Sequence, residues 1–106
     1  MKLHHVAIPV RDLERARAFY VDVLGLPEIR RQAHSIWVQA DGAIVMLEKG
    51  APAPDAHCIA FAIGAGERAQ WAGKVTVESA TAFTIYTRDP DGHRIGLTSY
   101  PDPAVP

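Results

Sequence analysis

The sequence predicts an α+β fold built from two consecutive βαβββ units, and two observations support this. The two halves of the chain open with similar stretches, HVAIPV from residue 5 and CIAFAI from residue 58. They also close with similar stretches, DGAIVML from residue 41 and DGHRIGL from residue 91. Matches at both ends of both halves, in the same order, indicate an internal repeat.

Each half reads as a strand, a helix and three further strands. In the first half, residues 2–10 form the strand, and Asp12 and Glu14 are acidic residues of the kind that favour a helix start. Gly25, followed by Pro27, ends this helix. The strands that follow are expected near residues 28–32, 35–39 and 43–48.

The second half repeats the order with a shorter helix, expected around residues 65–72 after a strand at 57–63. Its last strands are expected near residues 74–79, 82–88 and 93–98. The chain is thus interpreted as one domain over residues 1–106, with unit one at 1–50, unit two at 56–100 and a proline-rich extended tail at 101–106.

Composition excludes several classes of protein. The chain has 106 residues, which suffice for one domain with a modest core. Its net charge of −1, with no basic run longer than Arg30-Arg31, excludes a nucleic-acid or anionic-membrane partner. A single cysteine, no visible signal peptide and no apolar stretch of membrane length predict a cytoplasmic protein.

Alternation of apolar and polar residues assigns the faces of the strands. The apolar set in each strand, which includes Phe83 in the strand at 82–88, is expected to lie under a helix. The residues between them face the other way, whereas Trp37 cannot be assigned. The polar, sulfur-containing or small residues of interest on this uncovered side are His5, Met46, Glu48, Cys58, Tyr86, Arg88 and Gly96.

The opening LHHVAIPV, the VLGL at the end of the first helix and the DPDG before the last strand resemble the vicinal oxygen chelate superfamily. This group includes glyoxalase I, bleomycin-resistance proteins, fosfomycin-resistance transferases and extradiol dioxygenases. The resemblance covers nearly the whole chain and implies a cupped mixed sheet, with two units in pseudo-twofold arrangement and helices on the convex side. Its motifs are specific for the fold and not for the reaction, because the superfamily hosts many chemistries.

The resemblance also implies where a metal ion would bind. The superfamily carries a histidine in the first strand of each unit and a glutamate in the last, donors that suit divalent ions. Those positions are His5, Met46, Cys58 and Gly96 here, so His5 is the one such donor retained. We therefore expect no cofactor, and a divalent metal would need a rearranged site that uses His5 and Glu48.

Three interpretations of the function remain open from the sequence, and so does whether the chain is an enzyme. The first is a metal-free protein that binds a small organic molecule in the cup, as the bleomycin-resistance branch does, with ligand-binding residues His5, Met46, Cys58, Tyr86, Arg88 and Gly96. The alternative is a metal-dependent lyase, thiol transferase or dioxygenase; a glyoxalase-like lyase is the expected activity of an enzyme. An accessory subunit without a ligand is a third interpretation. Exposed edges on eight short strands predict a homodimer.

Overall fold

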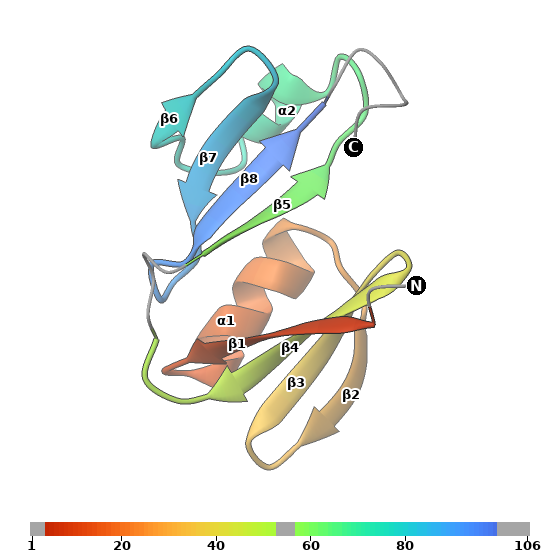
Figure 1. Cartoon of the computed structure of the whole chain (residues 1–106), viewed down its shortest axis with the longest axis vertical. Helices are drawn as coiled ribbons and strands as arrows, with labels where there is room; N and C mark the ends of the chain where they lie inside the picture. The colour runs from red at the N-terminus through yellow and green to blue at the C-terminus, as the bar shows by residue number, and fades with distance from the viewer. Residues whose placement is uncertain (1–3, 53–56, 100–106) are drawn as a thin grey trace. The chain divides into compact units, whose positions relative to one another are not determined.

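The computed structural model describes residues 4–52 and 57–99. The chain divides into two compact units, Met1–Ala53 and Pro54–Pro106, and each is described here by itself (Figure 1). The proline-rich tail expected at 101–106 lies outside the described residues. Among the described residues, no helix is both long and apolar enough to span a membrane.

Unit one contains a mixed sheet of four strands with the order β1-β4-β3-β2. β1 pairs with β4 in parallel, and the other neighbours are antiparallel. A helix, α1, continues directly into a π-helical segment, η1, between β1 and β2. The bounds are β1 (His5–Val10), α1 (Leu13–Arg17), η1 (Ala18–Val23), β2 (Glu28–Gln32), β3 (Ser35–Ala40) and β4 (Ala43–Lys49).

The ends of this helical stretch follow from the sequence as predicted. The carboxylate of Asp12 accepts a hydrogen bond from the backbone N–H of Arg15, at 3.1 Å, which caps the first turn. At the other end Gly25 has a φ of +79°. The N–H of Leu26 donates to the carbonyl of Tyr20 at 3.0 Å, and the chain then leaves the helix.

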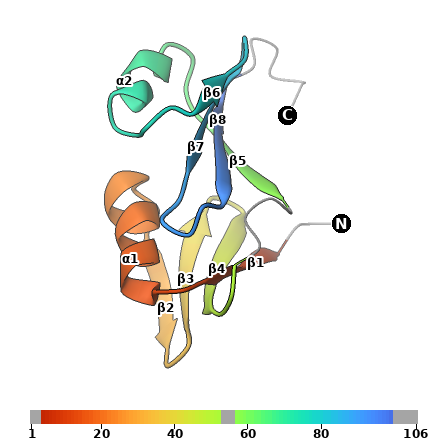
Figure 2. The same ribbon diagram turned by 90° about the vertical axis from the view of Figure 1, so that its left-hand side faces the viewer.

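The core of unit one lies between this helical stretch and one face of the sheet. α1 packs on β3 and β4, and Figure 2 shows it covering one side of them. Ala16 and Tyr20 from the helical stretch are fully buried. The buried strand residues are Ile8, Val10, Ile36, Val38, Val45 and Leu47. The alternation in β1 and β4 is the predicted one, whereas the faces of β3 cannot be assigned from the sequence. Burial of each such side chain contributes roughly 1.5–3 kcal/mol.

Unit two repeats this plan with the strand order β5-β8-β7-β6. β5 pairs with β8 in parallel, and the other neighbours are antiparallel. The bounds are β5 (Cys58–Ala62), α2 (Arg68–Ala72), β6 (Ser79–Ala80), β7 (Thr84–Arg88) and β8 (Arg94–Thr98). The buried apolar residues of its sheet are Ile85, Ile95 and Leu97.

Two expectations for unit two are wrong. The strand expected at 74–79 is reduced to Ser79–Ala80, because pairing with β7 is restricted to these two residues. Phe83, expected under a helix, is 42% exposed. The hydroxyl of Thr81 accepts the backbone N–H groups of Phe83 and Thr84, which forms a turn, so β7 begins only at Thr84.

The short helix α2 buries no residue of its own. Arg68 fixes it instead, since its guanidinium donates to the carbonyl of Thr81 at 2.7 Å and to that of Ala82 at 2.9 Å.

The register of the strands confirms the internal repeat. In unit one His5 pairs with Ile44 and Ala7 pairs with Met46. In unit two Cys58 pairs with Arg94 and Ala60 pairs with Gly96, which are the counterparts at the same offsets. The fold class is therefore confirmed as α+β with two βαβββ units, each with its own hydrogen-bonded sheet. A cup that both units form together stays a prediction.

Candidate functional site

The candidate residues lie on the face of each sheet opposite its buried apolar residues, and we call these surfaces open face 1 and open face 2. Open face 1 carries the side chains of His5, Ala7, Ile44, Met46, Glu48 and Trp37. Open face 2 carries those of Cys58, Ala60, Ala62, Tyr86, Arg88, Arg94 and Gly96. Each candidate residue therefore lies on the face of its sheet that the alternation predicts. The expected convergence of residues 5, 46, 58 and 96 involves both units and stays a prediction.

Open face 1 has an aromatic centre that the sequence leaves unassigned. Trp37 pairs with Met46 on one side and with Arg30 on the other. The guanidinium carbon of Arg30 lies 5.1 Å from the centre of the Trp37 ring, a cation–π contact. Among the described residues the buried indole N–H of Trp37 has no hydrogen-bond partner. The alternation along β3 places this ring beside Met46.

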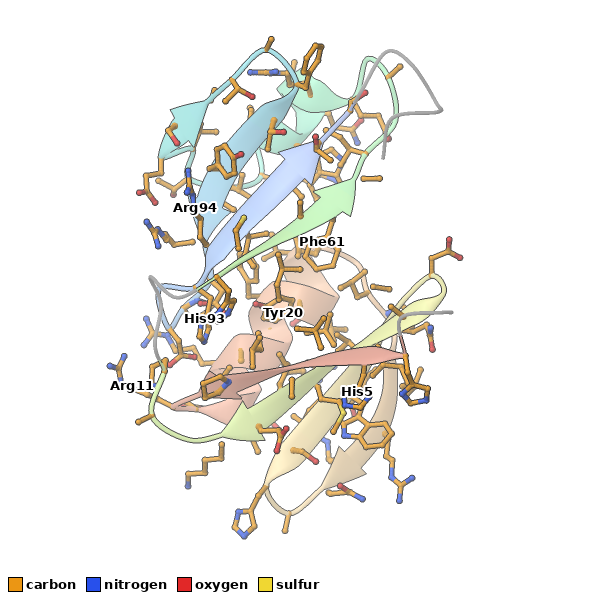
Figure 3. All side chains as sticks on the ribbon, in the orientation of Figure 1. His5, Arg11, Tyr20, Phe61, His93 and Arg94 are labelled. Carbon is orange, nitrogen blue, oxygen red and sulfur yellow. The ribbon has the colours of Figure 1, made fainter. Side chains whose placement is uncertain are left out.

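His5 stands at the edge of open face 1, at the start of β1 (Figure 3). Its Nδ1 atom lies 2.9 Å from Nδ1 of His4, so one ring donates a hydrogen bond to the other. Glu48, by contrast, pairs with Pro9, whereas His5 pairs with Ile44. A strand rises about 3.3 Å per residue, so these two positions lie about 13 Å apart along β4. The register does not bring His5 and Glu48 together.

Open face 2 explains the glycine in the last strand. Gly96 is buried between Ala60 on β5 and Tyr86 on β7. A Cβ atom at residue 96 would lie 3.2 Å from Cγ2 of Thr84 and 3.4 Å from Cε1 of Tyr86. It would also lie 3.4 Å from Cβ of Ala60. A Cβ atom at residue 96 would therefore be in close contact with side chains on both adjacent strands.

The aromatic ring of Tyr86 makes a cation–π contact with Arg94. The guanidinium carbon of Arg94 lies 4.2 Å from the ring centre. Arg94 is exposed and stands at the first position of β8 (Figure 3). Arg94 is not among the candidates expected from the sequence, although the same alternation that places Gly96 on open face 2 also places residue 94 there.

Arg88, one of the ligand-binding residues expected from the sequence, is hydrogen-bonded to other groups of the protein. Its Nε and Nη2 atoms donate to the two carboxylate oxygens of Glu78 at 2.5 and 3.0 Å. Its Nη1 atom donates to the carbonyl of Gly92 at 3.0 Å. The hydrogen bond from Arg88 lowers the pKa of Glu78, and the charge of Arg94 lowers it further.

Cys58 and His57 lie on different sides of the first strand of unit two. The thiol of Cys58 is exposed on open face 2, where its strand partner is Arg94. The ring of His57 stacks on the fully buried His93, with 5.0 Å between ring centres. Its Nε2 atom is buried and has no hydrogen-bond partner among the described residues. The ring of His57 therefore does not lie on open face 2 beside Cys58.

Residues 2–84 match the family model of the Glyoxalase/Bleomycin resistance protein/Dioxygenase superfamily. The chain belongs to this superfamily. No curated protein matches the sequence. Among solved structures, it is similar to a lactoylglutathione lyase from Agrobacterium tumefaciens, with a TM-score of 0.78, 20% identity and coverage of 92% of each chain.

Two further solved structures of glyoxalase-like proteins share the fold. A glyoxalase/dioxygenase from Nostoc punctiforme has a TM-score of 0.77 and 25% identity, with coverage of 95% of this chain and 92% of that one. A possible glyoxalase from Bacillus cereus has a TM-score of 0.77 and 24% identity, with coverage of 93% and 99%. The superfamily and its fold are therefore established for this chain.

The sequence resemblance implies four positions for metal ligands. In this chain those positions do not carry the usual histidine and glutamate side chains, apart from His5. His5 offers an imidazole, Met46 a thioether and Cys58 a thiol, whereas Gly96 offers no donor. Within residues 4–52 and 57–99, no three His, Cys, Asp or Glu side chains form a group that could hold a metal ion. Zinc, nickel and manganese ions prefer nitrogen and oxygen donors in such sites, and among these four residues only His5 has a donor of that kind.

Proposed function

We propose that this member of the glyoxalase/bleomycin-resistance superfamily binds a small, partly apolar organic molecule on the open faces of its sheets and does so without the divalent metal. The packing around Gly96 carries this proposal. A Cβ atom at residue 96 would lie 3.2 Å from the methyl group of Thr84 and 3.4 Å from the ring of Tyr86, so a ligating glutamate there would require these side chains to move. The position thus serves side-chain packing in this chain.

The surfaces themselves favour an apolar ligand. On open face 1, Met46 and Ile44 are half-buried and lie in register with Trp37 and Gln39 respectively. On open face 2, Ala60 and Ala62 are exposed. Binding sites for small molecules are mostly lined by apolar and aromatic side chains, with a few polar groups that orient the ligand. Tyr86 and His5 are polar groups of this kind on the two faces.

The test has a metal arm and a ligand arm. The full chain, purified without metal, is titrated with Zn²⁺, Ni²⁺ and Mn²⁺ by calorimetry, and we expect no stoichiometric binding. Stoichiometric binding that His5→Ala abolishes, and that His34→Ala retains, would overturn the proposal in favour of a metal-dependent lyase, thiol transferase or dioxygenase. His34 is an exposed histidine in the turn before β3 and serves as the matched control.

In the ligand arm, thermal-shift screening of small organic molecules is repeated with Tyr86→Ala. We expect at least one compound that raises the melting temperature of the wild type by several degrees and loses this effect in the variant. A screen without any stabilising compound would contradict the proposal. We propose in addition that the protein is a cytoplasmic homodimer, for which sedimentation equilibrium should give twice the monomer mass.

A further inference from the structure

The two arginines of open face 2 differ in their hydrogen-bond partners. The guanidinium group of Arg88 donates hydrogen bonds to the carboxylate of Glu78 and to the carbonyl of Gly92. No acceptor or carboxylate is bonded to the guanidinium of Arg94 in the part of the chain that the structure describes. The contact that Arg94 does make is with the face of the Tyr86 ring. Arg94 is thus a charged group with hydrogen-bond donors still available.

The stacking on Tyr86 holds Arg94 in one place on the surface. A guanidinium group that lies on an aromatic ring keeps its N–H groups directed outward, where they can donate to an incoming acceptor. Tyr86 is itself held, because its ring packs over the backbone of Gly96 and against β8. The donor group is therefore oriented before a ligand arrives, which reduces the entropy lost on binding.

Arg94 lies near a carboxylate that is hydrogen-bonded to another residue. The charge of Arg94 contributes to the lowered pKa of Glu78, but both carboxylate oxygens of Glu78 accept hydrogen bonds from Arg88. An incoming anion therefore does not displace Glu78 from the N–H groups of Arg94.

The surface next to Arg94 is small and apolar. The strand partner of Arg94 is Cys58, and the next positions of the same face on β5 are Ala60 and Ala62. All three are exposed. The guanidinium of Arg94 lies over Tyr86, and Gly96 separates Tyr86 from Ala60. A flat apolar group can therefore extend from Arg94 across Gly96 to Ala60.

We infer that Arg94 is the anchor of open face 2 for an organic monocarboxylate, whose carboxylate it binds and whose apolar part lies over Gly96 towards Ala60. This inference rests on the proposed function and names the class of its ligand. A guanidinium group binds a carboxylate through two parallel N–H···O bonds, which an amide or an alcohol of the same shape cannot accept as well.

The experiment compares benzoate with benzamide, its neutral counterpart, by NMR titration of the full chain. We expect benzoate to shift the backbone amides of residues 58–60, 86 and 94–96 and the side-chain Nε–H of Arg94. Arg94→Gln should weaken the affinity at least tenfold. Arg94→Lys, which keeps the charge and loses the two-pronged donor, should weaken it less. Because Arg94 is exposed, an unchanged spectrum away from these residues verifies that each variant is folded.

Arg30→Gln is the matched control, since Arg30 also lies on an aromatic ring but belongs to open face 1. It should leave the affinity for benzoate unchanged. Equal affinity of wild type and Arg94→Gln for benzoate would overturn the inference, and so would equal binding of benzoate, benzamide and inorganic phosphate. Binding of benzamide on the same face with no dependence on Arg94 removes the inference and leaves the proposed function standing. If no small molecule binds to either face, both are refuted.

Discussion

The ring of Tyr86 lies against the backbone of Gly96, and a Cβ atom at residue 96 would lie 3.4 Å from Cε1 of that ring. The two residues are direct partners in the antiparallel pair of β7 and β8. An aromatic side chain that covers a glycine on the neighbouring strand compensates for the missing side chain in the sheet. Gly96 is thus part of the packing of unit two, at the position where the superfamily resemblance places a metal-binding carboxylate.

The first prediction follows from this packing. Gly96→Ala should lower the free energy of unfolding by about 1–2 kcal/mol, because the new methyl group is forced against Thr84 and Tyr86. Urea unfolding followed by circular dichroism measures this difference. Gly42→Ala is the control, since a Cβ atom at that turn glycine meets nothing within 4 Å. Equal stabilities of the two variants would mean that residue 96 is not tightly packed.

A second prediction concerns the start of the helix in unit one. Asp12→Ala removes the acceptor of the Arg15 backbone N–H and should cost about 1 kcal/mol of stability. Asp22→Ala removes a carboxylate from the same helical stretch without removing a cap, and its side chain is 62% exposed. It should change the stability by about 0.5 kcal/mol or less. The comparison fails if both variants unfold at the same urea concentration.

The third prediction tests the core of unit one. Leu47 is fully buried, so Leu47→Ala should lower the free energy of unfolding by about 2–5 kcal/mol through lost burial and the cavity left behind. Ile29→Ala changes a side chain that is 46% exposed and should cost much less. Differential scanning calorimetry of both variants provides the measurement. A larger effect at residue 29 would contradict the assigned faces.

A fourth prediction concerns the dependence of stability on pH. The hydrogen bond from Arg88 lowers the pKa of Glu78 in the folded protein below its ordinary value of 4.5. The stabilisation is therefore present above that value and is lost as the pH falls through the lowered pKa. The melting temperature of the wild type should exceed that of Glu78→Gln at pH 6, and the gap should close towards pH 3.

Glu48→Gln is the control for this series, because Glu48 is exposed and has no ion-pair partner among the described residues. Its melting temperature should follow that of the wild type over the same pH range. A gap between wild type and Glu78→Gln that stays constant from pH 6 to pH 3 would show that the Glu78–Arg88 pair does not contribute as described.

Local signals in the sequence predict much of this fold. Asp12 and Gly25 mark the two ends of the helical stretch, and period-two alternation assigns the faces of β1, β4, β5 and β8. These signals work because a cap and an alternation depend on neighbours along the chain. The repeat adds long-range information, since a known order of elements in one half predicts the order in the other.

What the sequence does not predict depends on contacts between distant strands. Residues 75–77 have strand-forming side chains, yet β6 is formed only by the two residues that pair with β7. Trp37 and Arg94 become candidates only when the register shows that one lies beside Met46 and the other lies over Tyr86. The packing of Tyr86 on Gly96 likewise requires the pairing of β7 with β8, which alternation alone does not specify.

The common register of the two sheets gives every open-face residue a numbered counterpart. Trp37 stands in unit one where Tyr86 stands in unit two, since one pairs with Met46 and the other with Gly96. Counterparts can therefore be exchanged one at a time between the halves, with strand lengths and loops left intact. Such grafts would transfer the side-chain chemistry of one surface onto the other.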